Sequence, residues 1–218
     1  DLLSFAAFHM SDGTVDGKRV LSTESIRVMQ ETQTTAANWA DEWGVGWDIR
    51  WFESDGGRVK VIGHGGTTNG FQARLTLVPD RRYAIAMLTN SARGAAFNDR
   101  VESWALEHEL GLTRPELPKV KIAPDALERF AGQYTQPQAE YSISVDDGGL
   151  RVQPESVSPL TGKRTTPPAF TMAPIGERQF VITSGDAEGR RVDFFGHSDG
   201  SDAPRFIRMH GRLAERAS

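Results

Sequence analysis

The stretch VIGHGGTTNGF, Val61–Phe71, places a histidine beside two glycines at the end of a run that alternates like a β-strand. An imidazole can donate a hydrogen bond or change its charge near neutral pH. Glycines let backbone N–H groups approach a ligand without obstruction by side chains. His64, Gly65 and Gly66 are therefore candidate binding or catalytic residues, although the same letters also describe an ordinary tight turn.

Predicted strands and helices on both sides would position this stretch. RVKVIGH leads into it, FQARLTLVP follows it, and YAIAMLTN comes after a turn containing Pro79 and DRR. Helices are predicted over DLLSFAAFHM and, with Ser22 as N-cap, over TESIRVMQ. A third helix, ending at Gly111, is predicted by the helical spacing of Phe97, Val101, Trp104, Ala105 and His108.

The segment WGVGWDIRW, between Trp43 and Trp51, is open to two interpretations. Its tryptophans recur every four residues, as on a helix, but its apolar residues also alternate with glycines and charged residues, as on a strand. Two glycines in one helical turn would cost about 2 kcal/mol relative to alanine. We therefore predict one strand over the segment, with a glycine face open to close approach by another element.

The amino-acid composition and the pattern of the chain change after residue 112. LTRPELPKVKIAP is rich in proline and has no helical period, which predicts a linker over residues 113–123. Short strands follow, and DDGG at 146–149 predicts a hairpin, so Asp146 and Asp147 are expected in a turn. We predict an α+β fold: an antiparallel sheet flanked by helices in residues 1–112, and a small all-β barrel or sandwich in residues 124–218.

Composition excludes several classes of function. The 218 residues carry a net charge of −4 without a strongly basic stretch, which argues against nucleic-acid binding. No apolar run is long enough to span a membrane, and the lack of cysteine excludes thiol catalysis. HEL at 108–110 lacks the second histidine of a zinc helix, so we predict no metal and no cofactor. His9, His197 and His210 are isolated and are expected to be exposed or hydrogen-bonded.

The ordered segments DLLSFAAFHMSDG, VLSTESIRVMQ, WGVGW, GHGGTTNGF and LVPDRRYAIAMLTN resemble the C-terminal portion of the serine β-lactamase-like family. This family includes class C β-lactamases, penicillin-binding proteins, esterases and D-aminopeptidases. The resemblance covers residues 1–112, and LERFAGQY at 127–134 resembles the opening of the lipocalin-like domain that follows many such domains. One strand of the family carries Lys-Thr-Gly or His-x-Gly, and His64-Gly65-Gly66 matches the second form.

The resemblance implies a role for each matching position. His64 would face the substrate and the catalytic tyrosine, and the N–H of Thr67 would be one of two oxyanion donors, worth about 3 kcal/mol of transition-state stabilisation. The substrate-binding residues would be Gly65, Gly66, Thr68 and Asn69, with Gly66 leaving room for a substrate backbone or carboxylate. Relatives often have Gly-Thr-Pro where this chain has Thr67-Thr68-Asn69, which bears on substrate choice.

The family nucleophile, the serine of Ser-x-x-Lys, has no counterpart in these 218 residues, and neither Tyr-x-Asn nor Ser-x-Asn occurs. We therefore expect the chain to be the C-terminal part of a serine acyl hydrolase and to be inactive alone. Its partner would be the upstream half of the same protein, carrying those motifs, and its substrate a small-molecule or peptide acyl compound. The residues do not choose between a β-lactam, an ester and a D-peptide.

A non-catalytic binding module is the alternative. In that interpretation the barrel holds a small apolar ligand or a peptide, and the first half serves only as its platform. The family resemblance favours a periplasmic or extracellular location, which the residues themselves do not indicate.

Overall fold

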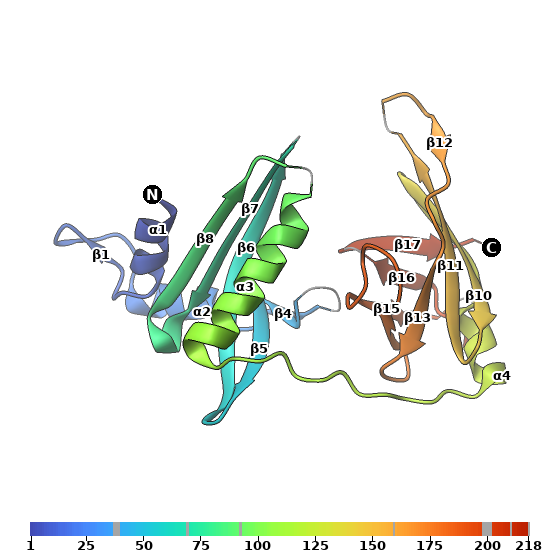
Figure 1. Ribbon diagram of the computed structural model, residues 1–218, viewed down its shortest axis with the longest axis horizontal. Helices are drawn as coiled ribbons and strands as arrows, with labels where there is room; N and C mark the ends of the chain where they lie inside the picture. The colour runs from blue at the N-terminus through green and yellow to red at the C-terminus, as the bar shows by residue number, and fades with distance from the viewer. Residues whose placement is uncertain are drawn as a thin grey trace. The chain divides into compact units, whose positions relative to one another are not determined.

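The computed structural model describes residues 1–36, 40–68, 70–91, 93–158, 160–197, 202–209 and 211–217. The chain forms two compact units, one of residues 1–36 and 40–116 and one of residues 117–218 (Figure 1). The predicted fold class is confirmed, because the first unit is an antiparallel sheet flanked by helices and the second is a closed barrel.

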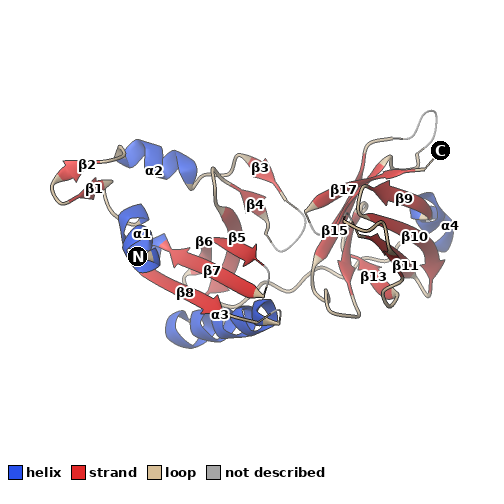
Figure 2. Ribbon diagram, turned by 90° about the horizontal axis from the view of Figure 1, so that it is seen from above, coloured by secondary structure: helices blue, strands red, loops and turns tan. Residues whose placement is uncertain are grey.

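The sheet of the first unit has six antiparallel strands in the order β3-β4-β5-β6-β7-β8, and β1 and β2 form a separate hairpin. Figure 2 shows α1 and α3 on opposite faces of this sheet. The elements are α1 Leu2–His9, β1 Thr14–Val15, β2 Lys18–Arg19, α2 Thr23–Met29, β3 Thr34–Thr35, β4 Glu42–Trp43, β5 Asp48–Ser54, β6 Gly57–Thr68, β7 Phe71–Val78, the 3-10 helix η1 Pro79–Arg81, β8 Tyr83–Thr89 and α3 Gly94–Leu110.

Alternation along the strands divides the core of the first unit in two. Ile62 of β6 packs with Ala6 of α1, whereas its neighbour Val61 packs with Leu106 of α3. Successive side chains of a strand point to opposite faces, so one strand serves both cores. We refer to these faces as the α1 face and the α3 face.

The prediction of one strand from Trp43 to Trp51 was wrong, because a turn divides the segment into β4 and β5. The N–H of Gly44 donates to the carbonyl of Trp47 at 2.9 Å. Gly46 has a φ of 78°, which glycine adopts readily and other residues rarely do. The expected close approach is confirmed at Gly44, where an added Cβ would lie 2.3 Å from the Met29 carbonyl oxygen.

The predicted helix before Gly111 is present as α3, but the apolar stripe predicted for it does not form its buried face. Phe97 and Trp104 are 59% and 58% exposed, and Ala105 is the one residue of that stripe that is buried. The buried face instead carries Glu102, which pairs with buried arginines of the sheet. Apolar periodicity could not reveal a helix face whose partner is charged.

The second unit closes eight strands into a barrel. The strand order is β10-β9-β17-β16-β15-β14-β13-β11, the pairing of β10 with β11 completes the circle, and β12 extends β11. The elements are α4 Pro124–Leu127, the 3-10 helix η2 Glu128–Phe130, β9 Gly132–Gln136, β10 Ala139–Asp146, β11 Gly149–Val157, β12 Arg164–Thr165, β13 Phe170–Pro174, β14 Gln179–Ile182, β15 Arg191–Phe195, β16 Phe206–Met209 and β17 Arg212–Arg216.

Aromatic side chains fill the interior of the barrel. The ring of Phe194 lies 4.9 Å from Phe130, 5.4 Å from Phe180 and 5.8 Å from Tyr134, between centroids. All four residues are at most 2% exposed. The predicted DDGG hairpin is also confirmed, since Asp146 pairs with Gly149 across a two-residue turn.

His9 differs from the expectation that the isolated histidines are exposed or hydrogen-bonded. His9 is only 3% exposed, its ring lies 5.0 Å from that of Trp47, and its Nδ1 has no hydrogen-bond partner. Burial lowers the pKa of His9 because it disfavours the charged imidazolium. His197 is exposed, as expected, and His210 lies outside the described residues.

Candidate functional site

The candidate residues lie where β6 continues beyond the end of its neighbour β5. The ladder between β5 and β6 runs from Ser54 opposite Gly57 to Asp48 opposite Gly63. The ladder between β6 and β7 continues further, to Thr68 opposite Phe71. Residues 64–68 therefore pair with β7 on one side only. We call this segment, His64–Thr68, the open edge.

Hydrogen bonds of β5 show which of its backbone groups face β6. The carbonyl of Ile49 accepts from the N–H of Asp41 at 2.9 Å, and the N–H of Trp51 donates to the Asp41 carboxylate at 2.8 Å. Ile49 and Trp51 thus direct these groups away from β6. Because the direction alternates along a strand, Asp48 directs its backbone groups toward Gly63 of β6.

The same alternation places an N–H group on the open edge. On β6, Gly63 faces the β5 side, so Gly65 and Thr67 face that side as well. The two residues lie beyond Asp48, where the ladder with β5 has ended. The backbone N–H of Thr67 is therefore directed to the open edge, as an oxyanion donor must be, and away from β7.

His64 lies at the start of the open edge, on the α1 face. Its side chain is exposed, and its ring is 6.2 Å from that of Trp43 in an edge-to-face arrangement. Trp43, from β4, is half-buried and forms an aromatic wall beside the imidazole. Sequence patterns place Trp43 only in a strand, because its position beside His64 depends on the hairpin that pairs β4 with β5.

The neighbouring glycines leave space above the strand. A Cβ added at Gly66 would meet nothing closer than the Ala73 side chain at 3.9 Å, which is ordinary van der Waals contact. Packing within the described residues thus does not require glycine at this position, although close approach by a ligand would. Gly65 is similarly unobstructed, with its nearest atom, the Ala73 carbonyl oxygen, at 3.5 Å from an added Cβ.

The two threonines differ in their partners. The Thr67 hydroxyl donates to the side-chain oxygen of Gln72 on β7 at 2.7 Å, on the α3 face. Thr68 is exposed, and Asn69 lies outside the described residues. Of the predicted site residues, His64, Gly65, Gly66, Thr67 and Thr68 therefore share one strand end, as neighbours in sequence must. The sequence analysis missed Gln72, which the pairing of the two strands places opposite Thr67.

Four buried charges lie behind this strand end, on the α3 face. Arg74 donates twice to Asp48, at 2.6 and 2.8 Å, and once to Glu102, at 3.1 Å. Arg50 donates to Glu102 at 2.5 and 2.9 Å, and its Nε lies 3.1 Å from Asp48. We call these four residues the charge ring. The Thr76 hydroxyl also contacts Glu102.

Opposite charges decide the ionisation of the ring. Burial alone would raise the pKa of Glu102, but Arg50 and Arg74, with the Thr76 hydroxyl, hold that pKa well below its usual value of 4.5. Burial alone would lower the pKa of Arg74, but its hydrogen bonds and charge interactions with Asp48 and Glu102 raise it instead. Glu102 and Arg74 are therefore both charged at neutral pH.

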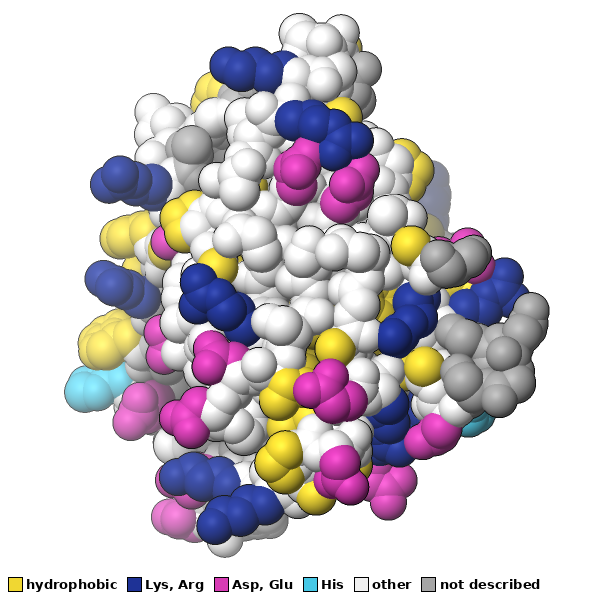
Figure 3. Space-filling view, turned by 90° about the vertical axis from the view of Figure 1, so that its right-hand side faces the viewer, with side chains coloured by type: hydrophobic (Ala, Val, Ile, Leu, Met, Phe, Trp, Pro, Cys, Tyr) yellow, Lys and Arg dark blue, Asp and Glu magenta, His cyan; other side chains and the backbone are white. Residues whose placement is uncertain are grey.

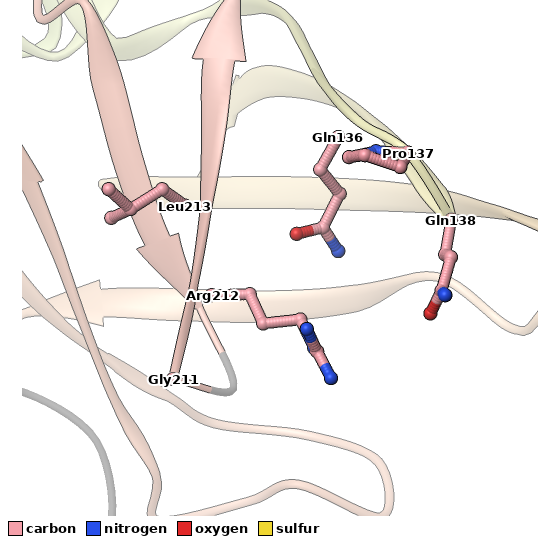
Figure 4. A pocket seen from close by; sticks show the side chains of 6 residues that line it. All are labelled: Gln136, Pro137, Gln138, Gly211, Arg212 and Leu213. Carbon is pink, nitrogen blue, oxygen red and sulfur yellow. The ribbon is translucent and has the colours of Figure 1, made fainter.

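The second unit has a pocket of about 340 Å3 at its surface (Figure 4). It lies between the turn that joins β9 to β10 and the start of β17, apart from the aromatic interior. Its lining residues are Gln136, Pro137, Gln138, Gly211, Arg212 and Leu213.

The face in Figure 3 shows acidic and basic side chains interspersed, without a large area of one charge.

Within the part of the chain that the structure describes, no group of three or more histidine and carboxylate side chains is placed to hold a metal ion. None of the described helices is both long and apolar enough to cross a membrane.

Comparison with known families identifies the family of the first unit. The β-lactamase family model matches residues 1–109, half of the chain. The chain belongs to the β-lactamase family. The match includes β6 and the open edge, so the sequence resemblance is confirmed. Comparison with curated proteins gives no match.

Solved structures share the fold of both units. SurE crystallised with D-Leu has a TM-score of 0.67 and 22% identity, and the match covers 99% of this chain and 49% of SurE. A second SurE structure gives the same score and identity over 99% and 47% of the two chains. The octameric penicillin-binding protein homologue from Pyrococcus abyssi has a TM-score of 0.40 and 16% identity, covering 95% and 44%. This β-lactamase-family chain thus spans about half the length of SurE.

Proposed function

We propose that the chain supplies one wall of the active site of a serine acyl hydrolase, whose nucleophile lies in an upstream half of the same protein. The observation that carries the proposal is the open edge, where the Thr67 N–H is directed away from β7 next to an exposed His64. The complete enzyme would attack an ester or amide carbonyl with serine, form an acyl-enzyme and hydrolyse it.

Three residues of the open edge have a role in this reaction. The Thr67 N–H donates to the carbonyl oxygen as negative charge develops on it, with the second donor supplied upstream. His64 donates a hydrogen bond to the substrate or to the catalytic tyrosine of the upstream half. Gly66 leaves room for the substrate above the strand, as its unobstructed position supports.

The substrate class stays broad. A β-lactam, an ester and a D-amino-acid peptide all present a carbonyl to such an edge. The SurE structure with D-Leu makes D-amino-acid derivatives the first compounds to test on this chain. Acyl transfer through the serine requires no metal or organic cofactor in the proposed cycle.

Apolar surface of the first unit supports the upstream half as a partner. Leu88, Phe97 and Trp104 are 70%, 59% and 58% exposed. β8 is the last strand of the sheet, and within the described residues no strand pairs with its outer edge. Strand edges and large exposed apolar side chains mark surfaces that other segments cover.

The binding-module alternative has less support. Its apolar ligand would need space inside the barrel, yet Phe130, Tyr134, Phe180 and Phe194 occupy the interior. The surface pocket near Arg212 is lined largely by polar groups and does not suit an apolar ligand.

Reconstitution tests the proposal. The 218-residue chain is mixed with its upstream half, and hydrolysis of p-nitrophenyl esters and D-aminoacyl amides is followed. We expect a complex with burst hydrolysis, and no turnover by the chain alone. Serine-dependent turnover by the chain alone would contradict the proposal, as would a complex that neither hydrolyses these substrates nor is acylated.

Thr67→Pro tests the oxyanion donor specifically. Proline removes the backbone N–H and is tolerated where a strand's N–H does not take part in the ladder. We expect a loss of roughly 100-fold or more in kcat. The matched control Thr67→Ala keeps the N–H and removes only the side chain that contacts Gln72, so it is expected to keep most of the activity. Equal rates for the two variants would show that this N–H is not the donor.

A further inference from the structure

The ion pair between Asp48 and Arg74 crosses over β6 one residue before His64. Asp48 is on β5, opposite Gly63, and Arg74 is on β7, opposite Gly65. Their side chains meet on the α3 face through two hydrogen bonds of 2.6 and 2.8 Å. The pair thus joins the two strands that lie on either side of β6.

The crossing depends on the absence of a side chain at Gly63. A Cβ added there would lie 2.6 Å from Nη2 of Arg74 and 3.0 Å from its Cζ, and also 2.7 Å from the backbone carbonyl oxygen of Leu75. The guanidinium therefore occupies the space that any other residue would need. Gly63 leaves space on the α3 face for the ion pair between Asp48 and Arg74, whereas Gly66 leaves space on the α1 face.

The charge ring ties the same point to α3. Glu102 of α3 accepts from both Arg74 and Arg50, and Arg50 closes the ring against Asp48. The four residues are at most 8% exposed. A buried charge that lost its partner would cost several kcal/mol, so the ring has one stable arrangement.

Stability alone does not account for a ring of charges at this point. Well-packed apolar residues of similar volume often stabilise a core as well as buried ion pairs do, or better. A bidentate guanidinium–carboxylate pair differs in fixing both distance and angle. It does so at Gly63, the last residue of β6 that pairs with β5.

We infer that the Asp48–Arg74 pair is a positioning element, which holds β6 where β5 ends and so sets the location of His64 and the Thr67 N–H. The inference rests on the proposed function, because only in that function do His64 and the Thr67 N–H face a substrate. Asp48, Gly63 and Arg74 do not touch the substrate. They act through the backbone of β6, and their replacement is expected to displace the oxyanion donor.

The test uses the full-length enzyme with its upstream half. The reactive serine is titrated with a fluorophosphonate, so that rates refer to functional sites only. Arg74→Lys keeps the charge but loses the bidentate geometry, and we expect kcat per labelled site to fall roughly 10- to 100-fold with little change in KM. The matched control Arg208→Lys breaks a similar pair with Asp193 in the barrel, at 2.6 and 2.9 Å, and is expected to keep its kcat.

A purely structural role would give a different pattern. It would lower the labelled fraction and leave kcat per labelled site unchanged, which would overturn the inference. Should Arg74→Lys not fold, Asp48→Asn takes its place, because it keeps one side-chain oxygen that accepts from Arg74 and removes the second oxygen of the bidentate pair. A wild-type enzyme that is neither labelled nor active would refute the proposed function itself. Active wild type with unchanged variants would refute only the positioning role.

Discussion

The barrel and the sheet of this protein differ in the side chains that fill their interiors and in whether their strand edges are paired. Every strand of the barrel's eight-membered circle has a partner on both sides, and its interior is aromatic and aliphatic. Among the described residues, the sheet leaves residues 64–68 of β6 and the outer edges of β3 and β8 without a strand partner. Among the described residues, the buried charged and polar side chains lie in the sheet unit, not in the barrel.

This difference separates a unit whose strand edges are all paired within the unit from one that leaves backbone groups at residues 64–68 unpaired on one side. Closure removes unpaired backbone groups, and an apolar interior needs no specific partners. An open edge keeps N–H groups available for a ligand or another strand. The charge ring gives the sheet a fixed geometry at that edge.

The largest expected difference concerns folding of the isolated units. We expect residues 117–218 alone to unfold cooperatively and remain monomeric, because their core lies within the barrel. We expect residues 1–116 alone to self-associate or bind a hydrophobic dye, because Leu88, Phe97 and Trp104 are exposed. Circular dichroism, size-exclusion chromatography and dye fluorescence would measure this. A monomeric, dye-free sheet unit would show that its open surfaces need no cover.

The next effect concerns the charge ring. Glu102→Gln removes one charge and leaves Arg50 and Arg74 short of a partner, so we expect a loss of roughly 3 to 5 kcal/mol in unfolding free energy at pH 7. Four of the five tryptophans, Trp43, Trp47, Trp51 and Trp104, lie in the sheet unit, so tryptophan fluorescence reports mainly on unfolding of that unit. The barrel control Glu140→Gln breaks an exposed pair with Arg164 and is expected to have a much smaller effect.

The sign of the pH dependence follows from the direction of the shift. The pKa of Glu102 is lower in the folded protein than its usual value of 4.5. Its contribution is therefore complete above pH 4.5 and is lost as pH falls from there toward the folded-state pKa. Wild type should lose stability over this range more steeply than Glu102→Gln, so the two should converge. Parallel pH profiles would show that Glu102 does not supply the slope.

Much of the fold followed from local patterns in the sequence. The DDGG turn, the Ser22 cap and the Gly111 stop predicted a hairpin and helix ends that the structure contains. Ser22 accepts a hydrogen bond from the N–H of Ser25, and Gly111 has a φ of 64°. These signals depend on one or two residues and need no tertiary context.

The remaining features depended on contacts between distant segments. The turn at Gly44 arises where α2 approaches the chain, and the charge ring joins residues 26 to 52 positions apart. The buried face of α3 was missed because its key residue, Glu102, reads as a surface residue. For the candidate site, the sequence singled out His64 and Thr67 as candidates, but only the strand register indicates which backbone N–H groups are directed away from β7.

The smallest predicted effect concerns substrate charge at the open edge. Relatives with Lys-Thr-Gly place a lysine ammonium, a permanent cation, where this chain has the imidazole of His64. We expect His64→Lys to raise the kcat/KM of anionic over neutral esters by roughly fivefold, because an exposed ion pair contributes about 1 kcal/mol. The gain should shrink at high salt, since exposed charges are screened. His64→Gln, which adds no charge, should leave the ratio near that of wild type. If His64→Lys leaves the ratio unchanged at low salt, the side chain at position 64 does not face the substrate's charged group, and the open edge binds its ligand through backbone groups alone.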